Sequence, residues 1–301
     1  MPEKKWPSGE VEEKLVQMRE SGATLQEIAQ QAGVHLSTAA IHLNGIIPLS
    51  RMIQQLPRYP EKWLHIRGEC AWTADWHAPY FSMMWLKRLI VVCQKLGIPQ
   101  LAIVGDLTDL KWISRFAHRD LSGSLDEEMR IVVSLLQVLL RCFDRVYWIW
   151  GNHEDRLLVA LKGQDLLPVM ADLISEGETG DLYTSNAGTI LVDDDWRLVH
   201  PSTYSRDAAK TAVQIAAITH KNIACGHGHF IGYKHDVSGK YIGIDLGGMF
   251  DIEKQEYLHM GGPTTHPRWN PGFWVYHNGR PEPFDDALVN WDEWDINNDK
   301  L

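Results

Sequence analysis

Residues 101–109 read Leu-Ala-Ile-Val-Gly-Asp-Leu-Thr-Asp, an apolar run followed at once by glycine and, within four more residues, two carboxylates. A short apolar run that ends at glycine predicts a buried strand. Two other segments have the same form. The strand predicted over Glu69–Ala74 ends at Asp75-Trp76-His77, and that over Arg145–Trp150 ends at Gly151-Asn152-His153-Glu154. The sequence therefore predicts three strands that each end in polar side chains.

Amphipathic helices are predicted between these strands, over Phe81–Leu96 and Leu125–Phe143. The second is preceded by Ser124-Leu125-Asp126-Glu127, which matches the capping box that opens a helix. Alternation of strands and helices after residue 60 predicts an α/β layered domain with helices packed on sheet. In such domains ligand sites gather beyond the carboxyl ends of the strands, so we expect the polar groups there to converge.

Two later apolar runs end in histidines. Arg197–Val199 is followed by His200, and Asn222–Cys225 is followed by Gly226-His227-Gly228-His229. Five strand ends thus present carboxylate, amide or imidazole groups, all of which bind divalent cations. Each motif alone is weak, because Asp-x-His pairs arise by chance and a single loop histidine is more often a solvated surface residue. Their combination in this order is specific.

The motifs D-x-H, G-D-x-x-D, G-N-H-[DE], H and G-H-x-H resemble those of the calcineurin-like metallophosphoesterase superfamily, over about residues 69–230. Segments similar to Lys111–Arg119 occur in phage and prokaryotic members of this superfamily, which are described as nuclease-like or uncharacterised. The resemblance implies a layered β-sandwich flanked by helices and two divalent metal ions. It implies that the first ion is held by Asp75, His77, Asp106 and His229, and the second by Asp106, Asn152, His200 and His227.

The chemistry of a two-metal site explains why these residue types occur together. Two neighbouring cations repel each other, so a carboxylate and a hydroxide must bridge them, and the pair then clamps an in-line displacement at phosphorus. Asp106 is the expected bridge and, with His153, a catalytic residue. The resemblance makes His153 the general acid that protonates the leaving oxygen. Asp109 and Glu154 are expected to orient the ligands. Imidazole and carboxylate ligands favour Mn, with Fe, Zn or Ni as alternatives, over Ca.

His200 has competitors for its place in the ligand set. The family often has glycine directly after this histidine, whereas Pro201 stands here, and His220 or His235 can be considered instead. We select His200 because it closes an apolar strand, as the other ligands do.

Substrate contacts are predicted from the segment Lys111–Arg119, which mixes cationic and aromatic residues beside the second motif. Such a mixture can hold phosphate and stack a base. The alternative is a loop whose aromatic residues pack on the following helix. The predicted substrate-binding residues are Arg115, His118 and Arg156, with Arg206 and Lys210 as further phosphate contacts.

Residues 1–47 are predicted to form a small all-α module that precedes the phosphoesterase domain. Helices are expected over Val11–Glu20, after the capping box Thr24-Leu25-Gln26-Glu27, and over His35–Asn44. The last two resemble a helix-turn-helix, in which the final helix enters the major groove of DNA. That helix has no Lys or Arg, so we expect only a weak DNA contact by residues 24–44. A docking or oligomerisation module is the alternative.

The remaining boundaries follow from proline and charge. Pro48, Pro57 and Pro60 lie in a predicted linker, residues 48–62, which separates the module from a metallophosphoesterase domain over residues 63–280. Residues 281–301 are predicted to be an acidic C-terminal tail. The chain has 29 basic and 39 acidic residues, a formal charge of −10, which excludes a generally basic nucleic-acid-binding surface.

The cellular setting is predicted from what the sequence contains. No run approaches 18 apolar residues and the start is polar, so neither a membrane span nor a signal peptide is expected. The four cysteines, Cys70, Cys93, Cys142 and Cys225, form no Cys-x-x-Cys pair, as in a reducing cytoplasm. We expect a cytoplasmic protein of a prokaryotic or phage-infected cell.

Taken together, these patterns predict a metal-dependent phosphodiesterase that acts on nucleic acid or a nucleotide phosphoester. One alternative is a phosphomonoesterase or an esterase of cyclic nucleotides or other small molecules. Another, from a different class, is a DNA-binding regulator with an inert esterase domain.

Overall fold

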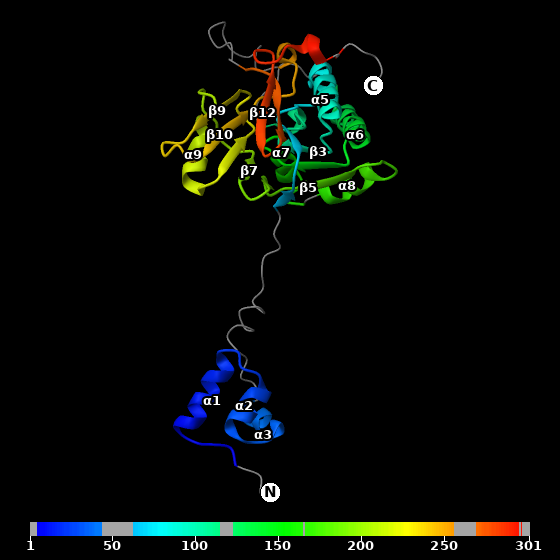
Figure 1. Ribbon diagram of the computed structural model, residues 1–301. Helices are drawn as coiled ribbons and strands as arrows, with labels where there is room; N and C mark the ends of the chain where they lie inside the picture. The colour runs from blue at the N-terminus through cyan, green and yellow to red at the C-terminus, as the bar shows by residue number, and fades with distance from the viewer. Residues whose placement is uncertain are drawn as a thin grey trace. The chain divides into compact units, whose positions relative to one another are not determined.

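The computed structural model has two compact units, Met1–Glu61 and Lys62–Leu301 (Figure 1). The structure describes residues 5–43, 63–114, 123–164, 166–255, 269–294 and 296. Within these ranges, none of the helices is both long enough and apolar enough to cross a membrane.

Three helices form the first unit: α1 (Glu10–Glu20), α2 (Leu25–Ala32) and α3 (Leu36–His42). Thr24 and Glu27 make the predicted capping box at the start of α2, and Gly33 ends that helix with a φ of 66°. Leu15, Ile28 and Leu43 are buried together and form the core of this three-helix unit. A compact three-helix unit therefore precedes the larger one in sequence.

The larger unit contains two six-stranded sheets, here named sheet I and sheet II. Sheet I has the strand order β12-β11-β2-β3-β4-β5. Its strands are β2 (Cys70–Thr73), β3 (Gln100–Val104), β4 (Arg145–Ile149), β5 (Asp181–Ser185), β11 (Gly272–His277) and β12 (Arg280–Asp285). The four strands β2 to β5 are parallel, so their carboxyl ends lie at one edge.

Sheet II has the strand order β1-β6-β7-β8-β10-β9. Its strands are β1 (Leu64–Ile66), β6 (Thr189–Val192), β7 (Trp196–Val199), β8 (Asn222–Cys225), β9 (Ile231–His235) and β10 (Ile242–Leu246). Strands β7 and β8 are parallel, with Val199 opposite Cys225 at their ends. The residues that follow these two strands therefore start from the same edge.

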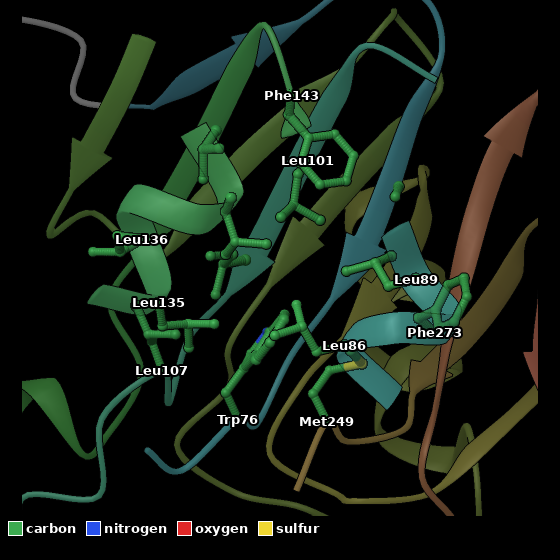
Figure 2. Packing of buried hydrophobic residues seen from close by; sticks show 14 of the residues in the cluster. Trp76, Leu86, Leu89, Leu101, Leu107, Leu135, Leu136, Phe143, Met249 and Phe273 are labelled. Carbon is green, nitrogen blue, oxygen red and sulfur yellow. The ribbon is translucent and has the colours of Figure 1, made fainter. Parts of the chain in front are cut away.

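Apolar side chains of both sheets share one core, which includes Trp72 and Val104 of sheet I and Leu198 and Ile244 of sheet II. Helices α5 (Met83–Leu96) and α6 (Leu125–Cys142) pack on the other face of sheet I; Figure 2 shows part of this second core, and α9 (Lys210–Thr219) covers sheet II. Figure 1 shows α5 and α6 on one side of the two sheets and α9 on the other. The predicted α/β architecture of two layered sheets flanked by helices is confirmed.

The C-terminal region differs from the acidic tail predicted over residues 281–301. Residues 280–285 form β12, which pairs with β11 at the edge of sheet I. Trp291, in the 3-10 helix η3 (Trp291–Trp294), packs against Trp85 of α5 with ring centroids 5.6 Å apart. Pro281 and Pro283 argue against a strand in the sequence. An edge strand nevertheless tolerates proline, because one of its sides forms no ladder hydrogen bonds. At least residues 281–294 thus belong to the folded unit.

Candidate metal centre

Seven predicted ligands converge where the strands of the two sheets end. Because β2, β3 and β4 are parallel, the residues that follow them meet at one edge of sheet I, and the residues after β7 and β8 reach the same place from sheet II. The short helices α7 (Glu154–Ala160) and η1 (Lys111–Ile113) begin beside this edge. The converging residues are Asp75, His77, Asp106, Asn152, His200, His227 and His229.

One cluster is formed by Asp75, His77 and His229, whose ligand atoms lie within 4.8 Å of one another. The Nε2 atoms of His77 and His229 are 3.0 Å apart, and His229 Nε2 is 3.4 Å from Asp75 Oδ1. All three side chains are buried. Two ring nitrogens and a carboxylate oxygen that face one another at this spacing suit a shared cation.

A second cluster is formed by Asp106, His200 and His227, with Asn152 beside it. His200 Nε2 lies 3.2 Å from Asp106 Oδ2 and 3.0 Å from Asn152 Oδ1. The other ring nitrogen of His200, Nδ1, is 2.8 Å from the carbonyl oxygen of Val104. Since Nδ1 donates to that carbonyl, Nε2 is directed at the cluster, which is the usual way a protein orients a histidine ligand.

The Asp106 carboxylate supports a metal between these clusters. Its Oδ1 accepts a hydrogen bond from the backbone N–H of His153 at 2.9 Å. Its Oδ2 is buried and has no hydrogen-bond partner among the described residues. In the metal-free protein the charge on this oxygen is balanced by the ring of His200, whose Nε2 lies 3.2 Å away, and a bound cation would take the place of the proton on that ring. The residues therefore fit two divalent ions around Asp106, and their donor set suits Mn, Fe, Zn or Ni.

The backbone at the ligands is strained. Positive φ values are uncommon outside glycine and cost about 1–3 kcal/mol each, and they cluster at functional sites where the surrounding fold enforces them. Backbone hydrogen bonds enforce them here, because Asp75 N donates to Gly105 O and His77 N donates to Asp106 O. The ligands with positive φ are Asp75 (53°), His77 (47°), Asp106 (50°), His227 (75°) and His229 (60°).

Two motif glycines make room for ligand side chains. A Cβ atom on Gly105 would overlap the ring of His200, and one on Gly151 would overlap the carboxylate of Asp106. Any larger residue at either position must displace a ligand. The glycines of G-D-x-x-D and G-N-H-[DE] are thus explained by close approach.

Glu154 joins two of the strand ends. Its Oε2 accepts the N–H groups of Asp106 (3.0 Å) and Gly151 (2.8 Å), and its Oε1 accepts the N–H and hydroxyl of Thr108 (2.9 and 2.8 Å). Burial, with the neighbouring Asp106 charge, raises the pKa of Glu154. This carboxylate holds the loops that carry Asp106 and Asn152.

Asp109 lies against two imidazoles of the centre. Its Oδ1 is 3.4 Å from His77 Nδ1 and 3.5 Å from His153 Nδ1. The contact to His77 Nδ1 leaves Nε2 for the first cluster. Asp109 therefore lies where a carboxylate can orient a histidine ligand.

His153 faces the second cluster from the start of α7. Its Nδ1 lies 2.6 Å from the carbonyl oxygen of Asp109, and its Nε2 is 3.9 Å from Asp106 Oδ2. Burial lowers the pKa of His153 to about 4. The positive charges of His77 and Arg156 also lower this pKa, whereas the negative charge of Asp106 raises it. In the metal-free protein the ring is thus neutral at pH 7, with Nδ1 donating to Asp109 and Nε2 accepting from Arg156 at 3.2 Å.

The predicted substrate contacts have different outcomes. Arg156 reaches the centre, since its Nη1 donates to the carbonyl oxygen of Asp109 at 2.8 Å. Arg206 is exposed, and Lys210 pairs with Asp207 at 3.5 Å. Arg115 and His118 lie outside the described residues.

The structure also separates His200 from its competitors. The ring of His220 lies near Tyr241 and that of His235 near Tyr233, with centroids 5.9 and 6.5 Å apart. Neither belongs to a metal-ligand cluster in the described part of the chain. Of these three histidines, His200 is the one whose Nε2 faces Asp106 and Asn152.

Aromatic residues that carry no motif also border the centre. Tyr204 lies edge-on to the ring of His227 at 5.3 Å, and Trp269 lies edge-on to that of His229 at 4.8 Å. A separate cavity of about 490 Å³, lined by Tyr80, Trp112 and Glu128 among others, includes none of the candidate ligands in its lining. Sequence reasoning did not identify Tyr204 or Trp269 as site residues. The only available signal was the position of Tyr204, four residues after His200.

The charge on His200 predicts how metal binding depends on pH. Burial alone would lower the pKa of His200, but the Asp106 carboxylate and, less strongly, Asp75 raise it to about 10. In the metal-free protein this ion pair contributes stability that is complete below pH 6.5 and is lost as the pH rises toward 10. A metal must displace that proton, so we expect proton release when Mn²⁺ binds at pH 8 and an apparent affinity that falls in acid. Calorimetric titrations in buffers of different ionisation enthalpy measure this, and equal heats in all buffers would contradict it.

Comparisons with known proteins add a few distant structural similarities. No protein-family model matches the chain, and no curated protein matches it. A single-mutant form of Vps29 from Entamoeba histolytica aligns with 13% identity and a TM-score of 0.33 over 72% of this chain and 98% of that one. Wild-type Vps29 complexed with Zn²⁺, from the same organism, aligns with 14% identity and a TM-score of 0.32, over 72% of this chain and 98% of that one. A dimetal phosphatase from Danio rerio aligns with 14% identity and a TM-score of 0.32, over 69% of this chain and 91% of that one. At these values the candidate centre rests on its own geometry.

Proposed function

We propose that this protein is a dinuclear metal-dependent phosphodiesterase that hydrolyses phosphodiester bonds of nucleic acid. One observation carries the proposal: two clusters of imidazole and carboxylate groups converge beside the buried Asp106 Oδ2, which lacks a hydrogen bond among the described residues. Strained ligand backbones and glycines that make room for His200 and Asp106 support it. Backbone strain and close packing concentrated at one edge of the sheets are typical of a catalytic centre rather than of an inert domain.

The residues of the chain have separate roles in this proposal. Two divalent ions, with Mn²⁺ as the first choice, would polarise the phosphoryl oxygens and lower the pKa of a bound water. Glu154 holds the loops of Asp106 and Asn152, and Asp109 orients His77. His153 turns Nε2 toward the centre, where it can hold a proton for the leaving oxygen once the negative charge of the substrate favours the protonated ring. Arg156 can donate to Nε2 only while the ring of His153 is neutral, so protonation of the ring would free that N–H of the guanidinium for the phosphate, while Nη1 keeps its bond to the carbonyl oxygen of Asp109.

The surroundings favour a diester with large substituents over a small monoester. The aromatic rings of Tyr204 and Trp269 border the centre and provide surface beyond the phosphate itself. The opposing observation is the formal charge of −10, which favours a small substrate such as a phosphomonoester or cyclic nucleotide. These two classes are the main candidates.

A substrate panel separates these candidates. The Mn²⁺-loaded full chain is assayed against single- and double-stranded DNA and RNA, bis(p-nitrophenyl) phosphate and p-nitrophenyl phosphate. We expect cleavage of nucleic acid and of the diester, with kcat/KM for the diester above that for the monoester. Efficient monoester turnover without cleavage of any nucleic acid would replace the proposal with the phosphomonoesterase alternative. Two bound metals without hydrolysis of anything would indicate a regulator with an inert domain.

We also propose that the first unit contributes a weak DNA contact through residues 24–44. Helices α2 and α3 are joined by a tight turn at Gly33, and α3 exposes Ser37 and His42. Leu36 and Ile41 are 46% and 74% exposed on the same helix, which favours the docking alternative instead. Fluorescence anisotropy of labelled duplex DNA with the full chain tests the DNA contact, and a measurement of oligomeric state tests the docking alternative. Weak, salt-dependent DNA binding by a monomer supports the proposal, and self-association without DNA binding supports docking.

A further inference from the structure

The loop that follows His200, residues 201–209, contains an exposed aromatic residue at the metal centre. Tyr204 lies edge-on to His227, with ring centroids 5.3 Å apart and an interplanar angle of 79°. Its side chain is nevertheless 54% exposed. Phe250, the aromatic neighbour of the other terminal histidine, His229, is fully buried. Tyr204 therefore presents a large aromatic surface to solvent at the place where a substrate must arrive.

Both ends of this loop are anchored, so Tyr204 is held near the centre. At the start, His200 is fixed by its contact with the carbonyl oxygen of Val104. At the end, the backbone N–H of Ala209 donates to Asp245 Oδ2 at 2.7 Å, and Ala209 is buried with a φ of 59°. These anchors limit how far the loop can carry Tyr204 away from His227.

The same loop offers a positive charge. Arg206 is exposed and forms no ion pair with a described residue, whereas Lys210 is paired with Asp207. Arg206 stands two residues after Tyr204 in the same loop, so both side chains start from one short stretch of backbone near the centre. Aromatic rings combined with cations along a backbone path are how proteins bind single strands without reading sequence.

We propose that residues 201–206 bind unpaired, single-stranded nucleic acid, with Tyr204 stacked on a base beside the scissile phosphate and Arg206 paired with a neighbouring phosphate. This inference rests on the proposed function and specifies its substrate class. An exposed ring needs a base with an accessible face, which a continuous duplex does not offer. Single-stranded substrates are therefore preferred over duplexes of the same sequence.

The experiment compares full-length variants on a mixed-sequence single-stranded oligonucleotide and on bis(p-nitrophenyl) phosphate. Loss of one stacked base lowers kcat/KM about 5- to 150-fold. We expect this for Tyr204→Ala on the oligonucleotide, so that the ratio of oligonucleotide to diester activity falls, and Tyr204→Phe restores the ratio. Arg206→Gln reduces the slope of log(kcat/KM) against log[salt] by about 0.7, the value for one phosphate of a single strand. Tyr233→Ala is the control, since Tyr233 is 63% exposed on β9.

Several results would overturn the inference. These are an equal loss on both substrates, a loss of bound metal in Tyr204→Ala, or a preference for duplex. Failure of the proposed function is recognised separately, because the wild type would then cleave no diester at all. In that case a hydrolysis-resistant phosphorothioate oligonucleotide still tests the loop by anisotropy. Equal Kd values for the wild type and Tyr204→Ala would reject it, and a 5- to 150-fold weaker Kd for the variant, reversed in Tyr204→Phe, would support it.

Discussion

Replacing Asp106 with Asn is expected to abolish turnover of every substrate and to reduce the metal content from two ions to one or none. The amide keeps an oxygen that can accept the hydrogen bond from His153 N, so the local backbone has no reason to move. The negative charge is lost, however, and Oδ2 is the atom without a hydrogen bond beside His200. Removal of a group of this kind typically costs about 10³-fold or more in kcat.

Metal analysis and initial rates measure both effects. Asp126→Asn is a matched control, because Asp126 pairs with Arg130 on the exposed surface of α6 and both its metal content and its rates should equal those of the wild type. An Asp106→Asn variant that retained two metals and half of the wild-type activity would remove Asp106 from the centre.

Glu154→Ala is expected to have the largest effect on stability. It leaves the N–H groups of Asp106, Gly151 and Thr108 and the hydroxyl of Thr108 without their acceptor. A buried donor without a partner costs about 1–3 kcal/mol, so we expect the free energy of unfolding to fall by about 3 kcal/mol or more. Because the same bonds hold the loops of Asp106 and Asn152, metal affinity should fall as well.

Denaturant unfolding of the metal-free protein isolates the stability effect from metal loss. Glu154→Gln should lie between the wild type and Glu154→Ala, since its amide oxygen still accepts from one side. Glu282→Ala serves as the control, because Glu282 pairs with Arg280 at the surface, where such pairs contribute little. If Glu154→Ala were as stable as the control variant, the joining role of Glu154 would be wrong.

The motif residues could be placed from the sequence because their positions follow from strand order. A ligand that comes directly after a parallel buried strand must start from the common edge, which is why Asp75, Asp106 and Asn152 converge. His200 required the structure, because only the tertiary arrangement shows that His220 and His235 lie near Tyr241 and Tyr233 instead.

Other features depend on contacts that local sequence does not encode. The prolines at 281 and 283 argue against a strand unless its place at the sheet edge is known. Tyr204 lies in an irregular loop with no periodic pattern, and its contact with the ring of His227, 23 residues later, is a tertiary contact. The neutral state of His153 likewise depends on burial and on Arg156, which no motif expresses.

The origin of the ligands in two different sheets has a mechanical consequence. Asp75, His77, Asp106 and Asn152 follow strands of sheet I, whereas His200, His227 and His229 follow strands of sheet II. Ions held by both sets would link the two sheets to each other. A ligand that binds only the native state adds about 2.7 kcal/mol to the free energy of unfolding when its concentration is one hundred times Kd. The melting temperature of the protein should therefore rise with the concentration of free metal.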